Sequence, residues 1–156
     1  MTTSALSLLN QQLDALLTDE RDTIANLANA SALLKQTVPD LNWAGFYLYD
    51  DNKDELVLGP FQGNVACMHI KIGRGVCGTA YAEQSTQRIA NVHAFADHIA
   101  CDAASNAELV IPLTKDNVQF GVLDLDSPTL NRFTEADQKE LETFAGVLMS
   151  HLDITR

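Results

Sequence analysis

Three cysteines are the residues of this chain whose chemistry is most informative. Cys67, Cys77 and Cys101 lie in the central part of the sequence, beside glycine-rich or polar residues. Their spacing matches neither a C-x-x-C redox pair nor a metal knuckle. In a small acidic chain of intracellular character, such thiols are more often catalytic than structural. Sulfur redox chemistry is therefore the leading hypothesis, with buried inert thiols as its alternative.

Two aspartates form a second candidate group, in Asp124-Leu125-Asp126. Alternate residues of a strand share a face, so both carboxylates project together while Leu123 and Leu125 face the other way. Mutual repulsion raises the pKa of at least one carboxyl, and a protonated carboxyl can assist an oxygen leaving group. Glu108, at the start of the preceding predicted strand, reaches the same face if the register allows. The alternative is a solvated outer face.

Trp43 and Tyr47 are four residues apart on a predicted strand and therefore share one face. They are either core residues or the walls of a pocket for a small, partly apolar ligand. Taken alone, the pair favours the core.

Two further motifs are weaker. Gly73 to Gly78 reads G-x-G-x-x-G, but the chain lacks the repeated β-α-β units of a dinucleotide fold, so a tight turn before a helix is the better interpretation. His69, His93 and His98, taken with the cysteines, match no common zinc-ligand spacing.

The elements that must position these residues follow from apolar spacing. Helices are predicted up to residue 38, strands and active-site loops over residues 42–126, and a final helix over residues 134–152, which together indicate a single α+β domain with a central antiparallel sheet. The finer predictions are helices at 6–17, 23–35 and 76–84, strands at 43–49, 55–58, 66–72 and 88–92, an irregular stretch at 93–107, and a hairpin of 108–113 with 119–125. Thr134 and Asp137 resemble a capping box, and an apolar stripe follows at Leu141, Phe144, Leu148 and Leu152.

Bulk composition is that of an ordinary globular domain. The 156 residues are 46% hydrophobic and 20% charged, and the net charge of −11 argues against a nucleic-acid partner. The N-terminus lacks the basic region of a signal peptide, and no apolar run reaches the ~20 residues that span a bilayer. We expect a cytoplasmic protein whose thiols are reduced at rest.

With these residues in view, the sequence resembles the free methionine-(R)-sulfoxide reductases, a branch of the GAF-domain superfamily. The resemblance rests on the stretches 42–47, 59–67, 73–78, 98–102 and 121–127. One departure is local: Ala96-Asp97 stands where these proteins usually have Pro-Gly.

The resemblance implies a GAF fold with helices on one side of the sheet and a ligand pocket on the other, often as a homodimer. It implies that Cys101 is the catalytic cysteine, Cys67 the principal resolving cysteine, and Cys77 a third cysteine that joins disulfide exchange. The substrate pocket that it implies is formed by Trp43, Tyr47, Glu108, Asp124 and Asp126.

The implied activity is reduction of free methionine-R-sulfoxide, an oxidative-damage product, without a bound cofactor or metal. Cys101 becomes a sulfenic acid, Cys67 converts it to a disulfide, and thioredoxin, supplied by NADPH through thioredoxin reductase, restores the thiols. Locally, Asp102 opposes thiolate formation at Cys101, whereas His98 favours it if the segment turns helically. Two alternatives remain open: a non-catalytic GAF ligand-binding module, and a redox sensor whose signal is the Cys67–Cys101 disulfide.

Overall fold

A six-stranded sheet forms the centre of the protein, in a computed structural model that describes residues 6–99, 101 and 103–154. Its strand order is β3-β2-β1-β6-β5-β4, and every neighbouring pair is antiparallel. The predicted α+β class is confirmed. The elements are α1 (Leu8–Leu17), α2 (Thr23–Thr37), β1 (Trp43–Asp50), β2 (Glu55–Gly63), β3 (His69–Lys71), α3 (Gly75–Glu83), β4 (Gln87–Ile89), the 3₁₀ turn η1 (Val92–Ala94), β5 (Ala107–Lys115), β6 (Val118–Ser127) and α4 (Glu135–Ser150).

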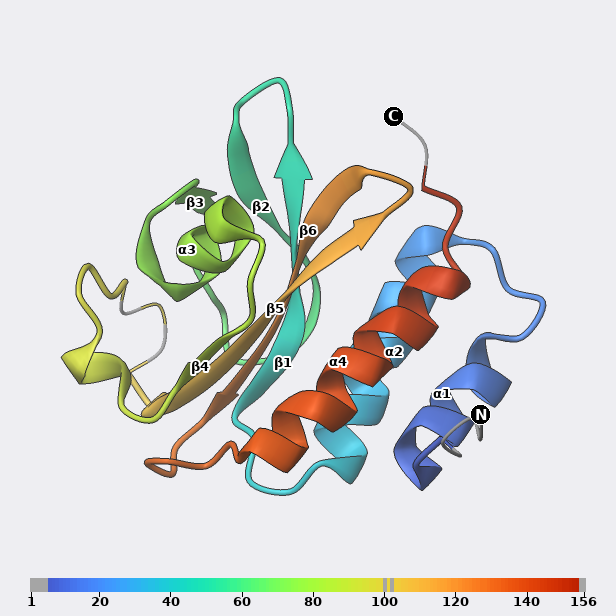
Figure 1. The fold of residues 1–156 in the computed structure, drawn as a ribbon, viewed down its shortest axis with the longest axis horizontal. Coiled ribbons are helices and arrows are strands. Elements are labelled where there is room, and N and C mark those ends of the chain that lie inside the picture. Colours follow the sequence, from blue (N-terminus) through green and yellow to red (C-terminus); the bar gives the residue numbers. More distant parts are fainter. Residues whose placement is uncertain (1–5, 100, 102, 155–156) are drawn as a thin grey trace.

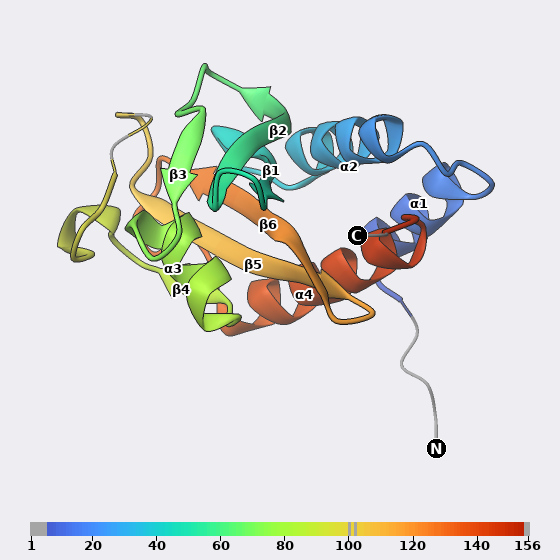
Figure 2. The same ribbon diagram turned by 90° about the horizontal axis from the view of Figure 1, so that it is seen from above.

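The helices divide unequally between the two sides of the sheet. α1, α2 and α4 lie together on one side, and α3 lies on the other with the segment around η1 (Figure 1). The view from above shows the same separation (Figure 2). No helix in the described part of the chain is long and apolar enough to cross a bilayer.

The side covered by three helices carries the larger apolar core. The sheet contributes Phe46, Leu109, Leu123 and Leu125, all without exposed surface, because alternate strand residues point toward the helices. The predicted stripe of α4 packs against them, and Leu141, Phe144, Leu148 and Leu152 are all buried.

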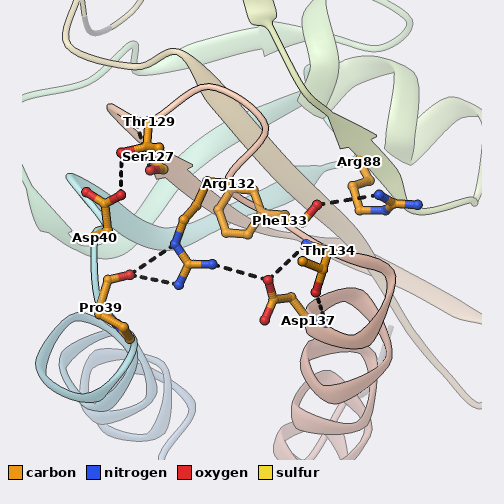
Figure 3. A network of polar contacts seen from close by, with 9 residues as sticks. All are labelled: Pro39, Asp40, Arg88, Ser127, Thr129, Arg132, Phe133, Thr134 and Asp137. Carbon is orange, nitrogen blue, oxygen red and sulfur yellow. Dashed lines mark hydrogen bonds and ion pairs between the residues drawn. The ribbon is translucent and has the colours of Figure 1, made fainter.

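The start of α4 is fixed by the predicted capping box (Figure 3). The Thr134 hydroxyl accepts a hydrogen bond from the Asp137 amide, and the Asp137 carboxylate accepts one from the Thr134 amide. Arg132 pairs with Asp137 at 3.2 Å and donates to the carbonyl of Pro39. This network ties α4 to the chain that leaves α2.

Two predicted strand boundaries are wrong. The strand predicted at 55–58, before the turn-forming pair Gly59-Pro60, is too short, because β2 continues to Gly63. The register against β1 shifts between Gly45 and Tyr47, so Pro60 lies at a β-bulge, where its missing N–H leaves no ladder bond unmade. The strand predicted at 66–72 is only β3, because residues 64–68 form a loop.

The other elements agree with the prediction within a few residues. β4 is shorter than expected, since Val92 belongs to η1 rather than to the strand. The hairpin β5–β6 turns at Asp116 and Asn117, which both have positive φ. Gly73 to Gly78 forms the tight turn into α3, and a side chain at Gly78 would meet the carbonyl of Lys71 at 2.5 Å.

Candidate active site

The predicted pocket residues meet in one row across three neighbouring strands. Trp43 of β1 pairs with Asp126 of β6, and Asp126 pairs with Glu108 of β5. Asp124 lies two residues back on β6, on the same face as Asp126. The expectation that Glu108 shares this face is confirmed, and the side that carries α3 therefore holds three carboxyl groups.

A small cavity lies over this row, with a volume of about 50 Å³. α3, the segment after η1 and the loop before β3 close it from above. Its lining includes all the predicted site residues except Cys67: Trp43, Tyr47, Cys77, Cys101, Glu108, Asp124 and Asp126, together with Ala66, Ile70, Arg74, Gly75, Val76, His98, Ile99 and Ser105.

Aromatic rings form one wall of the cavity. Trp43 stacks on Tyr47, with ring centroids 5.8 Å apart, and on Phe61 at 5.1 Å. Gly45 makes room for this stack, because a Cβ there would lie 2.2 Å from that of Phe61. Trp43 and Tyr47 are thus both core residues and pocket walls, which resolves the two interpretations left open by their spacing.

The same two aromatic residues hold the loop that carries Cys67. Trp43 Nε1 donates to the carbonyl of Asn64 at 3.1 Å, and the Tyr47 hydroxyl donates to the carbonyl of Cys67 at 2.9 Å. The position of Cys67 beside the cavity is therefore set by the wall of the cavity itself.

The carboxyl groups are nearly inaccessible to water. Glu108, Asp124 and Asp126 are 8%, 4% and 8% exposed. Burial is the main cause that raises the pKa of Glu108 and of Asp124 well above their ordinary values, and the neighbouring carboxylates raise both further. At neutral pH this arrangement favours keeping a proton within the group.

Cys77 belongs to this acidic group rather than to the disulfide. Its sulfur lies 3.8 Å from Glu108 Oε2, and burial followed by the Asp124 charge raises the pKa of its thiol. Asp124 Oδ1 is buried and accepts no hydrogen bond from any described residue. A positively charged group bound in the cavity would meet this oxygen.

Cys67 and Cys101 form a disulfide with their Cα atoms 5.3 Å apart. Thirty-four residues separate them in sequence, so the fold alone brings them together. Both residues are half-buried. Cys101 lines the cavity, whereas Cys67 lies behind it in the loop between β2 and β3.

An ion pair with Arg74, the residue just before α3, holds the segment before Cys101. Asp97 has φ +64°, a conformation that favours glycine, and its carboxylate accepts a hydrogen bond from Arg74 at 2.5 Å. The aspartate side chain thus makes an ion pair that a glycine at this position could not make. The segment is irregular rather than helical.

Neither local influence on the Cys101 thiolate is supported by these contacts. Burial and the neighbouring His93 lower the pKa of His98, which leaves its ring uncharged at neutral pH. Asp102 lies outside the described residues.

Within the described residues, the three histidines do not gather with the cysteines into a group that could hold a metal ion. His69 bonds Glu55 at 2.6 Å, His93 bonds Asn106, and two of the three cysteines are joined to each other. Among the described residues, the group able to hold a metal ion is instead Cys77, Glu108 and Asp124, whose ligand atoms lie within 4.8 Å of one another.

Some cavity residues were not predicted as site residues. Arg74 and Gly75 lie within the Gly73–Gly78 motif, which was interpreted only as a turn. Gly75 has φ +64°, and a Cβ there would press on Ile99 at 3.2 Å, so this glycine lets the segment before Cys101 approach α3. The glycine spacing was the available signal for these residues, but it did not indicate that the segment around Ile99 would pack against Gly75.

Comparison with known proteins places this geometry in a family. A model of the GAF domain matches residues 25–153. Protein YtsP of Bacillus subtilis is 57% identical, with 90% of this chain and 86% of the relative covered. The free methionine-R-sulfoxide reductase of Escherichia coli is 52% identical, with 94% and 88% covered.

A solved structure agrees with these relatives. The free methionine-R-sulfoxide reductase from Neisseria meningitidis, solved in complex with its substrate, superposes with a TM-score of 0.89 at 42% identity, covering 97% of this chain and 95% of that one. The chain therefore belongs to the GAF-domain family, within the branch of the free methionine-R-sulfoxide reductases.

Proposed function

We propose that this protein reduces free methionine-R-sulfoxide to methionine with its own thiols. The observation that carries the proposal is the Cys67–Cys101 disulfide at the edge of a cavity walled by Trp43 and floored by buried carboxyl groups. Disulfide formation is the expected end of a reaction in which a cysteine removes oxygen from a sulfoxide.

Two parts of the substrate, the S-methyl group and the α-ammonium group, have chemically matched partners in the cavity. The S-methyl group packs on the Trp43 ring, which offers an apolar face. The α-ammonium group binds the carboxylates, and the unpaired Asp124 Oδ1 is a suitable acceptor. A peptide-bound methionine lacks that ammonium group and carries extra chain, so the proposal restricts the substrate to the free amino acid.

Proton donation follows from the raised pKa of Glu108 and Asp124. A carboxyl that remains protonated at neutral pH donates a hydrogen bond to the sulfoxide oxygen, which makes the sulfur more electrophilic. In the proposal, Glu108, Asp124 and Asp126 together fill two roles: one protonated carboxyl donates this hydrogen bond, and the carboxylates bind the α-ammonium group. Cys77, whose thiol is kept protonated beside them, acts later as a third cysteine in disulfide exchange.

The sulfur chemistry then balances in two steps. The Cys101 thiolate attacks the substrate sulfur, the oxygen passes to Cys101 as a sulfenic acid, and methionine leaves. The Cys67 thiol attacks this sulfenic acid, releases water and forms the disulfide. In the disulfide form the cavity has room for only a few water molecules, so a new substrate enters after the disulfide is reduced and the Cys101 segment withdraws.

The wider setting is proposed on the same basis. A dithiol protein of the thioredoxin class returns the enzyme to its reduced form by thiol exchange. We further propose a homodimer that works in the cytoplasm, without a bound cofactor or metal.

A coupled assay tests the function. Thioredoxin, thioredoxin reductase and NADPH are mixed with the protein and with free methionine-R-sulfoxide, its S epimer or an N-acetylated R-sulfoxide. We expect NADPH oxidation with the free R epimer alone. If dithiothreitol also fails to support methionine formation from the free R epimer, the reductase proposal is wrong.

A further inference from the structure

Two apolar side chains close in sequence to Cys67 of the disulfide are largely exposed to solvent. Val65 is 87% exposed, more than any other large hydrophobic residue in the described chain, and Met68 is 68% exposed. They stand on either side of Cys67 in the loop between β2 and β3. A single exposed apolar residue is ordinary, but here two lie within two positions of a sulfur that a reductant has to approach.

Their exposure does not come from a loosely held backbone. The carbonyls of Asn64 and Cys67 accept hydrogen bonds from Trp43 and Tyr47, and the Met68 carbonyl accepts one from the Leu58 amide at 2.9 Å. These three bonds fix the loop at both ends and at Cys67. Ala66, between the two exposed residues, turns the other way and lines the cavity.

The disulfide also has a preferred side for attack. Thiol exchange requires the incoming thiolate to approach along the line of the S–S bond, from the side opposite the leaving sulfur. Cys101 lines the cavity and Cys67 does not. Because Cys67 is not part of the cavity lining, attack on its sulfur does not have to pass through the cavity, and its exposed apolar neighbours in sequence are Val65 and Met68. Cys101, in contrast, belongs to the cavity lining.

We propose that Val65 and Met68 form the docking surface for the reductant, a dithiol protein with an apolar rim around its reactive cysteine, and that this cysteine attacks Cys67 Sγ. The inference rests on the proposed function. The new bond joins the reductant to Cys67, the Cys67–Cys101 bond breaks, and Cys101 leaves as a thiolate in the cavity. The second thiol of the reductant then displaces Cys67, and the reductant leaves as a disulfide after a two-electron transfer.

The kinetic test compares a protein reductant with a small one. In the doubly substituted V65S/M68S protein, we expect the KM for thioredoxin to rise about tenfold, because the apolar contact area is lost. Turnover driven by dithiothreitol should remain unchanged, since a small dithiol needs no docking surface. Leu8→Ser is the matched control, because Leu8 is 69% exposed on α1, a helix on the side of the sheet opposite the cavity, and should alter neither rate.

The possible failures are distinct. An unchanged KM for thioredoxin in V65S/M68S would overturn the docking surface while leaving the reductase intact. An equal loss with both reductants would also overturn it, since the substitutions would then act on the active site. Absence of turnover by the unsubstituted protein with either reductant would instead refute the proposed function.

A trapping experiment tests the attacked sulfur. The oxidised protein is mixed with a thioredoxin whose second active-site cysteine is replaced by serine, so that the mixed disulfide persists. Peptide mass spectrometry should find thioredoxin attached to Cys67, and the yield should fall in V65S/M68S. Attachment mainly to Cys101 or Cys77 would overturn the proposed direction of attack.

Discussion

The two faces of the central sheet differ in what they bury. Facing α1, α2 and α4, the sheet buries mainly apolar side chains, among them Leu123 and Leu125. On the face toward α3, strand β6, which carries these two leucines, buries Asp124 and Asp126. Neighbouring residues of β6 thus lie in different environments, because alternate side chains of a strand point to opposite faces of the sheet.

This difference indicates where stability and chemistry are located. Burial of apolar surface stabilises the helix-covered face, whereas burial of like-charged carboxyl groups costs free energy on the cavity face. Proteins tolerate such destabilising groups mainly where function uses them. Substitutions on the two faces should therefore change different observables.

The largest expected effect belongs to Cys101. Cys101→Ser should abolish reduction of free methionine-R-sulfoxide down to the uncatalysed level, because a hydroxyl cannot replace the thiolate nucleophile. Circular dichroism of this protein and of the reduced, unsubstituted protein should be the same. Retention of turnover by the variant would remove Cys101 from its proposed role.

Leu125→Ala tests the helix-covered face. Leu125 has no exposed surface, so the cavity left by truncation should lower the free energy of unfolding by about 2–5 kcal/mol. Urea denaturation of the reduced protein measures this change. The folded fraction should keep its KM for the sulfoxide, and a several-fold rise in KM would show that the two faces are not independent.

Asp124→Asn tests the neighbouring residue on the cavity face and should act in the opposite direction. Removal of the buried carboxyl should raise the free energy of unfolding at neutral pH by roughly 1–2 kcal/mol while lowering turnover. Glu108→Gln is a second variant with the same expected directions. A lower free energy of unfolding in both variants would contradict the view that burial of these carboxyl groups destabilises the folded protein.

The pH dependence of this gain has a definite sign. Because the folded-state pKa of Asp124 is raised above its ordinary value of 3.8, the folded protein holds a proton that the unfolded chain releases as pH rises. The unsubstituted protein therefore loses stability relative to Asp124→Asn as pH rises above about 4. Denaturation at pH 4 and pH 8 should show a difference between the two proteins that is larger at pH 8.

Thr134→Ala should give the smallest effect. Loss of the capping hydroxyl at the start of α4 should cost roughly 0.5–1 kcal/mol of unfolding free energy, because one helix-terminal N–H loses its partner. Since α4 lies on the helix-covered face, the KM for the sulfoxide should stay the same. A changed KM would indicate that the network of Figure 3 reaches the cavity.

The sequence alone determined the parts that depend on local patterns. Strand alternation put Asp124 and Asp126 on one face, and the Thr134–Asp137 spacing predicted the cap of α4. Prediction from local sequence failed at Gly59-Pro60, where β2 pairs with β1 across a bulge in spite of the turn signal. The tertiary contact supplied hydrogen bonds that the local rule could not anticipate.

Other features were decided only by the tertiary structure. The register of three strands aligned Trp43, Asp126 and Glu108, and two loops far apart in sequence brought Cys67 within 5.3 Å of Cys101, measured between Cα atoms. The raised pKa of Glu108 likewise depends on burial by elements distant in sequence. Residue type and periodicity fixed which groups were available and which way they faced, while the distances and the exclusion of water that give them reactivity arose from packing across the whole chain.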